Sequence, residues 1–151
     1  MIGLFADHHR FEEQVGIELT VRPNDLDSLG HVNNAVVLEY LETGRWEWLA
    51  RNGLPSTGSI VPVVARIEID YRLEIRPPKV EIGTTLENAA ALLGSAADRY
   101  QCIFRQVVTR QRDNQSLTAV EARVQVAFID TIDRRIRNLQ DYLAQPREKD
   151  I

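Results

Sequence analysis

The chain has 151 residues, of which 44% are hydrophobic and 26% are charged, and its formal net charge at pH 7 is −4. This composition is that of an ordinary soluble domain, and the acidic balance argues against a general nucleic-acid binder, which usually presents a basic face. No apolar run approaches the roughly 20 residues that span a membrane, and the N-terminus lacks a signal-peptide pattern. The single cysteine, Cys102, allows no internal disulfide. We therefore expect a cytoplasmic protein.

The N-terminal part of the chain begins with one strand and continues into a polar turn. We expect a single domain over residues 1–151, with residues 1–14 and 145–151 as loose termini. Residues 15–22 alternate apolar and polar side chains, which is the pattern of a half-buried strand. Residues 24–34 are rich in Asn, Asp, Ser and Gly, and this composition predicts a turn.

A single long helix is predicted from Asn34 to Arg51, with a length of about 27 Å. Asn33 or Asn34 is a suitable N-cap, because an asparagine side chain accepts a hydrogen bond from a free N–H of the first turn. Asn52 and Gly53 are expected to end the helix through a left-handed cap.

The predicted helix has one apolar side. Its apolar residues fall on one arc at 100° per residue: Val37, Leu38, Leu41, Trp48 and Leu49. Gly44 lies on the same arc, and because glycine costs about 1 kcal/mol relative to alanine inside a helix, it indicates that another backbone approaches closely there. Arg45 projects toward the same side, three residues after Glu42, and we expect its stem to pack while its charged head reaches water.

The rest of the chain is predicted to be mostly strand. Four segments have strand-like patterns: residues 61–75, 80–93, 99–111 and 116–130. A short helical turn is expected around Leu139 to Ala144. One strand, one long helix and four strands in a meander predict an α+β fold, in which an antiparallel sheet of about five strands wraps around the helix.

The candidate chemistry lies where the polar turn meets the helix. The turn supplies Asp25, Asp27 and His31. The helix start supplies backbone N–H groups and partial positive charge, and the amides concerned are those of Asn33, Asn34 and Ala35. Such donors suit an oxyanion forming on a carbonyl, and a nearby carboxylate can attack that carbonyl or activate a water. On its own, however, an Asp-x-Asp pair is also common in structural turns.

Other site types have little support in the sequence. The pair Asp25 and Asp27 lacks the later acidic ligands of a calcium loop. There is no glycine-rich nucleotide motif and no serine-hydrolase elbow. We therefore expect no metal and no cofactor.

The segment DLDSLGHVNN, residues 25–34, resembles the signature of the hotdog-fold thioesterases. It is similar to the 4-hydroxybenzoyl-CoA thioesterase branch and to the related acyl-ACP thioesterases. The resemblance covers nearly the whole chain, including the long helix with Glu42 and the order of the strands. It implies a single hotdog domain that hydrolyses an acyl thioester to a free acid and a thiol, in a homodimer or homotetramer with the active site at the dimer interface.

The resemblance also implies roles for individual residues. In this family the second aspartate, here Asp27, is the nucleophile or general base, and the amides of the first helical turn polarise the thioester carbonyl. In the acyl-ACP branch a histidine and a later glutamate join the aspartate, and these roles would fall on His31 and Glu74. The sequence has Leu29 where that branch has an asparagine. Asp25 is expected to shape the loop.

Two other functions remain open. A hotdog-fold dehydratase or hydratase acting on a β-hydroxyacyl or enoyl thioester also needs an acid/base pair, which Asp27 and His31 would supply. A dimer that binds acyl thioesters without turnover would keep the same fold. Glu42 is a further candidate for a supporting role in any of these sites.

The expected partners are an acyl-CoA or an acyl carrier protein thioester, and neither nucleic acid nor a membrane. The sequence does not identify the acyl chain. Several basic residues are candidates to meet the phosphates of either carrier, but they are more typical of a solvated strand face: Arg72, Arg76, Lys79, Arg110 and Arg112.

Overall fold

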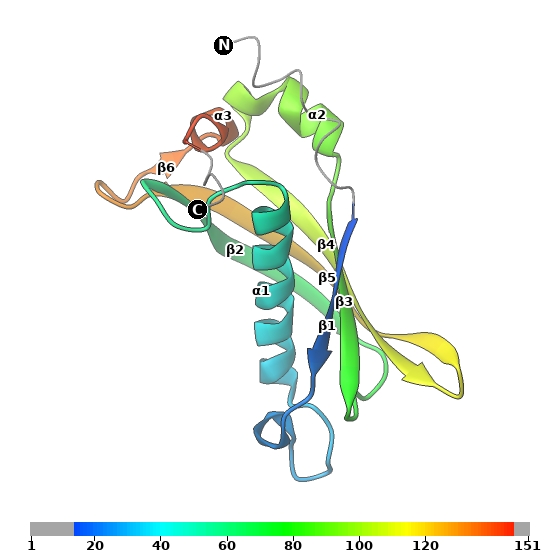
Figure 1. The fold of residues 1–151 in the computed structure, drawn as a ribbon. Helices are drawn as coiled ribbons and strands as arrows, with labels where there is room; N and C mark the ends of the chain where they lie inside the picture. The colour runs from blue at the N-terminus through cyan, green and yellow to red at the C-terminus, as the bar shows by residue number, and fades with distance from the viewer. Residues whose placement is uncertain (1–13, 147–151) are drawn as a thin grey trace.

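The structure of this chain is a computed structural model that describes residues 14–146 (Figure 1). One long helix, α1 (Asn34–Arg51), follows the first strand. The strands are β1 (Gln14–Thr20), β2 (Ile60–Tyr71), β3 (Lys79–Leu86), β4 (Gln101–Arg112), β5 (Gln115–Asp130) and β6 (Ile136–Arg137). The short helices are α2 (Ala89–Gly94) and α3 (Leu139–Leu143), with 3-10 turns at Pro23–Asp25 and Ala96–Asp98.

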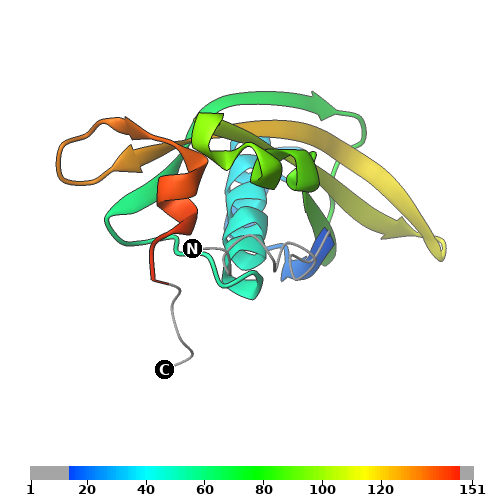
Figure 2. The same cartoon turned by 90° about the horizontal axis from the view of Figure 1, so that it is seen from above.

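The strands form one antiparallel sheet in the order β1-β3-β4-β5-β2, and β6 pairs with β5. Figure 2 shows the sheet curving around α1, so the predicted α+β arrangement is confirmed. The predicted four-strand meander is correct only for β3, β4 and β5. β2 pairs with β5, with Ile67 opposite Val124, and therefore lies at the edge farthest from β1. Consecutive strands are neighbours often but not always, and here residues 72–78 carry the chain back across to β3.

The predicted strand 80–93 is wrong in its second half. β3 ends at Leu86, and the next residues form the short helix α2. Leu92 and Leu93 are consecutive and both buried, which the alternating faces of a strand do not allow against one core. The alanines of this segment also favour helix over strand.

Both ends of α1 are where the sequence predicts them. Asn33 is the N-cap, and its side chain accepts a hydrogen bond from the N–H of Ala35 at 2.9 Å. At the other end Asn52 is the C-cap, and Gly53 has a φ of +67°, which glycine adopts without strain.

Gly44 marks the closest contact between α1 and the sheet. A Cβ at this position would lie 2.8 Å from Ile82 Cγ2, 2.9 Å from Thr84 Oγ1 and 3.0 Å from Gln106 Nε2, so the expected close approach is present. Gln106 is itself fixed, because its Nε2 donates to the carbonyl of Leu41 at 2.8 Å and to Thr84 Oγ1 at 2.9 Å.

Arg45 differs from the expectation that its head reaches water. The side chain is buried, and its Nη1 donates to Gln106 Oε1 at 2.9 Å. Burial lowers the pKa of the guanidinium, and the charge of Glu42 partly offsets this. Arg45 can be buried because Gln106, on the inner face of β4, accepts its hydrogen bond. The sequence pattern alone does not show that these two residues meet.

α1 does not cover the whole inner face of the sheet. It packs on β1 and β3 more than on the β2 side. Leu38, expected on the buried arc, is 37% exposed, because it faces the uncovered side. Tyr40, which was not in the predicted apolar set, is buried instead.

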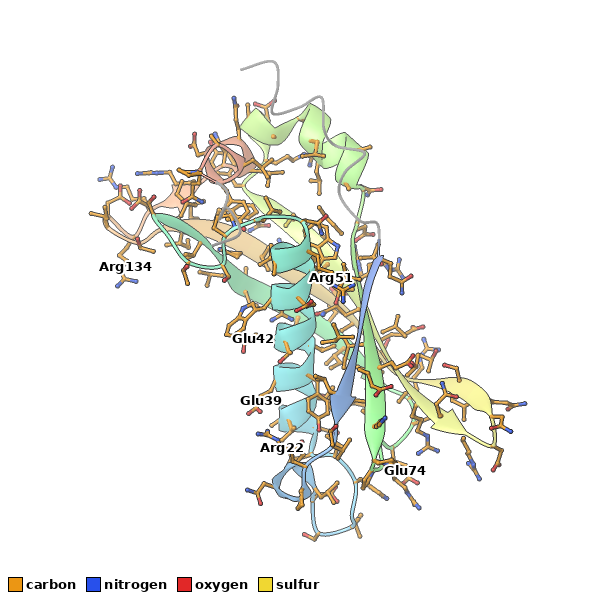
Figure 3. The ribbon with its side chains drawn as sticks, viewed as in Figure 1. Arg22, Glu39, Glu42, Arg51, Glu74 and Arg134 are labelled. Carbon is orange, nitrogen blue, oxygen red and sulfur yellow. The ribbon has the colours of Figure 1, made fainter. Side chains whose placement is uncertain are left out.

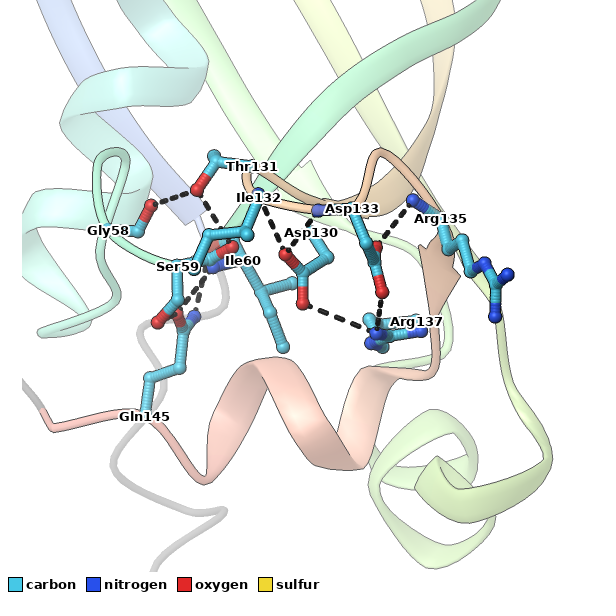
Figure 4. Close-up of polar contacts among 10 residues, drawn as sticks. All are labelled: Gly58, Ser59, Ile60, Asp130, Thr131, Ile132, Asp133, Arg135, Arg137 and Gln145. Atoms are coloured by element: carbon cyan, nitrogen blue, oxygen red, sulfur yellow. Dashed lines mark hydrogen bonds and ion pairs between the residues drawn. The ribbon is translucent and has the colours of Figure 1, made fainter.

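Residues 130–145 make polar contacts with each other and with the start of β2 (Figure 4). Asp130 and Asp133 fix the turn between β5 and β6, and both bind Arg137. After α3, the side-chain amide of Gln145 accepts from Ile60 N at 2.7 Å and donates to Ile60 O at 2.9 Å. Gln145 is therefore held in place rather than loose.

At the N-terminal side, Gln14 already belongs to β1. The remainder of the expected loose termini, residues 1–13 and 147–151, lies outside the described residues. None of the helices within residues 14–146 is long and apolar enough to cross a membrane.

Gly44→Ala is predicted to destabilise the protein. Alanine gains about 1 kcal/mol of helix propensity, but the new methyl group meets fixed core side chains, and overpacking of this kind costs about 1–3 kcal/mol. We expect a net loss of up to about 2 kcal/mol in the free energy of unfolding, measured by urea denaturation. Gly94→Ala is the control, because no atom lies within 4 Å of a Cβ there. Equal stability of the two variants would contradict this account of Gly44.

Candidate functional site

The loop between β1 and α1 closes on itself before the helix begins. Leu26 and Val32 form an isolated antiparallel bridge. The N–H of Asp27 donates to the carbonyl of His31 at 2.6 Å, and Gly30, at the tip, has a φ of +77°, where a side chain would be strained. The loop is thus a tight hairpin that brings Asp27 and His31 together.

The carboxylate of Asp27 is fixed through one oxygen. Its Oδ1 accepts hydrogen bonds from the N–H groups of Leu29 at 2.8 Å and His31 at 3.0 Å. Its Oδ2 receives no hydrogen bond from the described residues. The hydrogen bond from the His31 amide, together with that from Leu29, holds the pKa of Asp27 below its usual range. This arrangement presents an ionised carboxylate with one free oxygen at an exposed position.

The helix start leaves fewer amides free than the sequence suggests. The N–H of Asn33 donates to the carbonyl of Asp25 at 2.8 Å, and the N–H of Ala35 is used by the N-cap. Within residues 14–146, only the N–H of Asn34 among these three has no acceptor. The site therefore offers one free backbone donor at the positive end of α1.

Asp25 lies beneath the loop and is 1% exposed. Its carboxylate accepts from the backbone N–H of Arg22 at 2.9 Å, from Arg22 Nη2 at 2.9 Å and from Tyr40 Oη at 2.6 Å. Burial opposes its ionisation, but the hydrogen bonds from Tyr40 and Arg22 outweigh burial and hold the pKa of Asp25 below its usual range. With every lone-pair direction occupied, this carboxylate is a support and not a reactive group.

His31 meets Glu74, as the acyl-ACP resemblance implies. His31 Nε2 lies 2.7 Å from Glu74 Oε2, and Glu74 Oε1 lies 2.6 Å from Arg76 Nη2. If the ring is neutral and Nε2 carries the proton, Nδ1 is left as an acceptor. The backbone also joins the two segments, because Val32 N donates to Ile75 O at 2.8 Å.

Glu42 is not part of this cluster. Figure 3 shows Glu42 on the outer side of α1, well above the loop, while Glu74 lies near the foot of β3. The structure thus groups Asp27, His31 and Glu74 with the start of α1, and places Glu42 apart from them.

Several residues of the site were not identified from the sequence. Tyr40 binds Asp25 from the second turn of α1, and Tyr71, at the end of β2, donates from its hydroxyl to the carbonyl of Asn34 at 3.0 Å. Arg76 and Arg110 were expected on a solvated strand face, but both bind Glu74. Buried tyrosines usually hydrogen-bond through the hydroxyl, which is the only sequence signal that points to Tyr40.

No group of three or more His, Cys, Asp or Glu within the described part of the chain is placed to hold a metal ion. Cys102 is buried, and burial raises the pKa of its thiol to about 12. A reactive thiolate at this position is therefore disfavoured.

Comparison with known proteins assigns the family. Residues 21–146 match the model of the thioesterase-like superfamily. The chain belongs to this superfamily. A curated relative, the long-chain acyl-CoA thioesterase FadM of Escherichia coli K12, is 28% identical over 135 residues, which is 87% of this chain and 96% of FadM.

Solved structures agree with this assignment. A mutant 4-hydroxybenzoyl-CoA thioesterase complexed with 4-hydroxybenzoyl-CoA matches with a TM-score of 0.72 at 15% identity, covering 89% of this chain and 100% of that one. The probable thioesterase YbaW of Escherichia coli matches with a TM-score of 0.63 at 26% identity, covering 87% and 93%. The hotdog fold expected from the DLDSLGHVNN segment is confirmed, and this member of the thioesterase-like superfamily is a thioester hydrolase.

Asp25→Asn is predicted to reduce stability at neutral pH. Asparagine is uncharged, so the ion pair with Arg22 is lost, and its side-chain NH2 faces a group that donates to Asp25 in the wild type. Hydrogen bonds to charged groups are worth about 2 kcal/mol. Because the folded-state pKa of Asp25 is lowered, its stabilising contribution is present above the unfolded value of about 3.9 and is lost as the pH falls through the folded value. The difference between wild type and Asp25→Asn in urea unfolding is expected to be largest near pH 7 and to narrow below pH ~4.

The control is Asp113→Asn, in the exposed β4–β5 turn. It is expected to leave the unfolding free energy unchanged within about 0.5 kcal/mol. A loss for Asp25→Asn that stays constant down to pH ~2 would show that charge is not the source of the stabilisation.

Proposed function

We propose that the enzyme hydrolyses an acyl-CoA at the loop formed by residues 25–34, with Asp27 as the reacting carboxylate. The observation that carries the proposal is the free oxygen of Asp27, held by two backbone amides, close in the chain to the free N–H of Asn34 at the start of α1. The similarity to FadM, which is named a long-chain acyl-CoA thioesterase, favours CoA as the carrier and a long acyl chain. An acyl carrier protein thioester is the alternative substrate.

The chemistry follows from these two groups. Asp27 attacks the thioester carbon directly, or removes a proton from a water that attacks it. The oxyanion that forms accepts a hydrogen bond from Asn34 N–H, where the partial charge of the helix end adds to the stabilisation. The C–S bond then breaks, and the thiolate leaves and takes up a proton. Direct attack would leave an acyl anhydride on Asp27, which a water hydrolyses to the free acid.

His31 and Glu74 assist in this scheme. Their contact through Nε2 at 2.7 Å fixes the ring, and Nδ1 remains available to orient the substrate or the attacking water. Asp25 holds the loop, and no metal or redox cofactor takes part in the proposed steps.

The acyl chain is proposed to lie on the β2 side of α1. The space between α1 and β3 is filled at Gly44 and at the Arg45–Gln106 contact, so a chain entering from Asn34 cannot pass there. On the other side the inner face of β2 carries partly exposed apolar side chains, and Leu38 of α1 is exposed beside it. The exposed Glu42 lies one turn beyond Leu38 on the same face of α1, so β2 supplies most of the apolar wall. β2 runs from Tyr71 back to Ile60 for about 36 Å, which suits a long chain.

A homodimer through β2 is proposed to cover this surface, with a homotetramer as a further assembly of dimers. β2 is an edge strand, and its inner face carries partly exposed apolar side chains, among them Val64 at 40% and Tyr71 at 41% exposure. An exposed apolar edge strand is an unstable arrangement in a monomer in water. A cytoplasmic location stays a prediction.

Part of the β2 edge is closed to such pairing. The N–H and C=O of Ile60 are hydrogen-bonded to the Gln145 side chain, so they point away from β5 and are not available to a partner strand. In an antiparallel pair, every second residue of β2 directs its N–H and C=O toward the free edge. The next such residue is Pro62, which has no N–H to donate. Beyond the bulge between Val64 and Arg66, the alternation places the backbone groups of Ile67 and Ile69 on the free edge. The partner strand is thus expected to pair with the second half of β2.

Asp27→Asn is predicted to reduce the kcat of thioester hydrolysis by at least about a hundredfold. Asparagine can still accept from the Leu29 and His31 amides, so the loop is expected to keep its shape while the charge is lost. The measurement is thiol release from aromatic, short, medium and long acyl-CoAs and from the matching carrier-protein thioesters. Asp113→Asn is the control and is expected to keep wild-type turnover. Full activity of Asp27→Asn would exclude Asp27 as the reacting group.

Val64→Lys is predicted to weaken self-association by roughly a hundredfold, because a lysine charge on the inner face would be buried in the dimer. Val63→Lys is the matched control, since Val63 is similarly exposed, at 44%, but lies on the outer face of the same strand. The measurement is sedimentation equilibrium of both variants. Dissociation of neither variant, or of both equally, would contradict an interface on the inner face.

A further inference from the structure

Glu74 is not held in place by the sheet. β2 ends at Tyr71 and β3 begins at Lys79, and the residues between them form no regular element. The buried side chain of Ile75 and its carbonyl bond to Val32 anchor the middle of this segment. They do not fix the neighbouring glutamate side chain, which is partly exposed and would otherwise sample several rotamers.

Arg76 holds the carboxylate of Glu74 and lies beside His31, with its Nη2 3.5 Å from His31 Nε2. Its Nη2 lies 2.6 Å from Glu74 Oε1, while His31 Nε2 lies 2.7 Å from Oε2. Each carboxylate oxygen thus has its own partner. An exposed ion pair of this kind adds little to stability, so its main effect is on where the carboxylate points.

Arg110 holds the backbone of the same residue. It lies near the end of β4, and its Nη1 donates to the carbonyl of Glu74 at 2.6 Å. Its Nε is buried without a hydrogen-bond partner, and the guanidinium forms no ion pair within residues 14–146. Keeping a half-buried cation without a carboxylate partner costs free energy, and the contact with Glu74 is the one polar contact that it makes in the described chain.

We propose that Arg76 and Arg110 are positioning residues that hold Glu74 against His31, Arg76 through the carboxylate and Arg110 through the main-chain carbonyl. Neither arginine touches a reacting atom. The inference rests on the proposed role of the His31–Glu74 pair in hydrolysis, and it assigns two residues that come from different elements to that pair.

The first test compares Arg76→Gln and Arg110→Gln with wild type in steady-state thioester hydrolysis. Misplacing a group of the site by about 1 Å costs up to about a hundredfold in rate, so we expect kcat to fall roughly tenfold or more with KM within about twofold. Arg72→Gln is the matched control: Arg72 starts the same segment but pairs with Glu121 on the sheet, and its loss is expected to leave kcat unchanged. Arg76→Lys, which keeps the charge, is expected to recover part of the rate.

A double-mutant cycle separates positioning from general destabilisation. If Arg76 acts through Glu74, Arg76→Gln has no further effect in a Glu74→Gln background. Additive losses in the two backgrounds, or losses that follow the melting temperature of the variants, would overturn the proposal.

A spectroscopic readout does not depend on activity. The imidazole ¹H–¹⁵N signals of His31, assigned by comparison with His31→Gln, are expected to shift in Glu74→Gln and in Arg110→Gln, since Arg110 contacts Glu74 and not the ring, but not in Arg72→Gln. A shift in Arg76→Gln does not discriminate, because Arg76 Nη2 lies 3.5 Å from His31 Nε2, and for Arg76 the double-mutant cycle decides. Unchanged signals in Arg110→Gln would overturn its positioning role.

The outcomes distinguish the two proposals. Loss of activity in Glu74→Gln with wild-type kcat and wild-type His31 signals in both arginine variants would refute positioning and leave the proposed function standing. If the His31 signals shift in Arg110→Gln but the wild-type enzyme releases no thiol from any thioester, the proposed function is refuted. The proposal that the arginines position Glu74 then still stands.

Discussion

The buried carboxylate of Asp25 is the constraint on which the site depends. A charge at this depth is tolerated only when its hydrogen bonds are satisfied. Its donors are Arg22, two residues after the end of β1, and Tyr40 of α1. The carbonyl of the same residue accepts from Asn33, the N-cap of the helix. The end of β1, the loop and the start of α1 are therefore all hydrogen-bonded to Asp25. If the loop moved away from α1, the buried carboxylate would lose its hydrogen bonds or become exposed.

This tie explains how two aspartates in one short motif differ in their surroundings. Asp25 and Asp27 are separated by one residue, and hydrogen bonds lower the pKa of both. The donors differ: side chains surround Asp25, whereas backbone amides of its own loop hold Asp27 through one oxygen. Only the second arrangement leaves an ionised oxygen exposed to a substrate. A site preorganised in this way needs little rearrangement when charge develops on the thioester carbonyl.

The parts of the fold that are encoded locally were predictable from the sequence. The helix begins and ends as expected because Asn33 and Gly53 are local cap signals, and the glycine at 44 correctly indicated a close contact. Most errors concern long-range partners. The pairing of β2 with β5 and the burial of Arg45 against Gln106 depend on which segments meet in space, and no local pattern records that. The change from β3 to α2 is different, because the alanines of residues 89–91 were a local helix signal that was not used.

The site shows the same division. The loop with Asp27 and His31 is contiguous in sequence, so its composition and its resemblance to a family sufficed to propose it as the site. The meeting of His31 with Glu74 joins two distant segments, and only the resemblance pointed to it. The contacts of Arg76 and Arg110 with Glu74 were not predicted, because basic side chains are usually solvated. Nothing in the pattern distinguishes an arginine that reaches a carboxylate or a carbonyl of another residue.

The off-centre position of α1 connects the fold to the chemistry. α1 packs against β3 so closely that Gly44 is required, and the Gln106 network fills that side of the interface. Because α1 lies toward β1 and β3, the β2 side is left uncovered, with Leu38 of α1 and Val64 and Tyr71 of β2 exposed. Asn34 and the loop of Asp27 lie at the foot of this uncovered side, where Tyr71 of β2 reaches the first residue of the helix. Close packing on one side of α1 thus leaves open apolar surface on the other, and the free amide of Asn34 lies at the end of that surface, where the proposed mechanism places the thioester carbonyl.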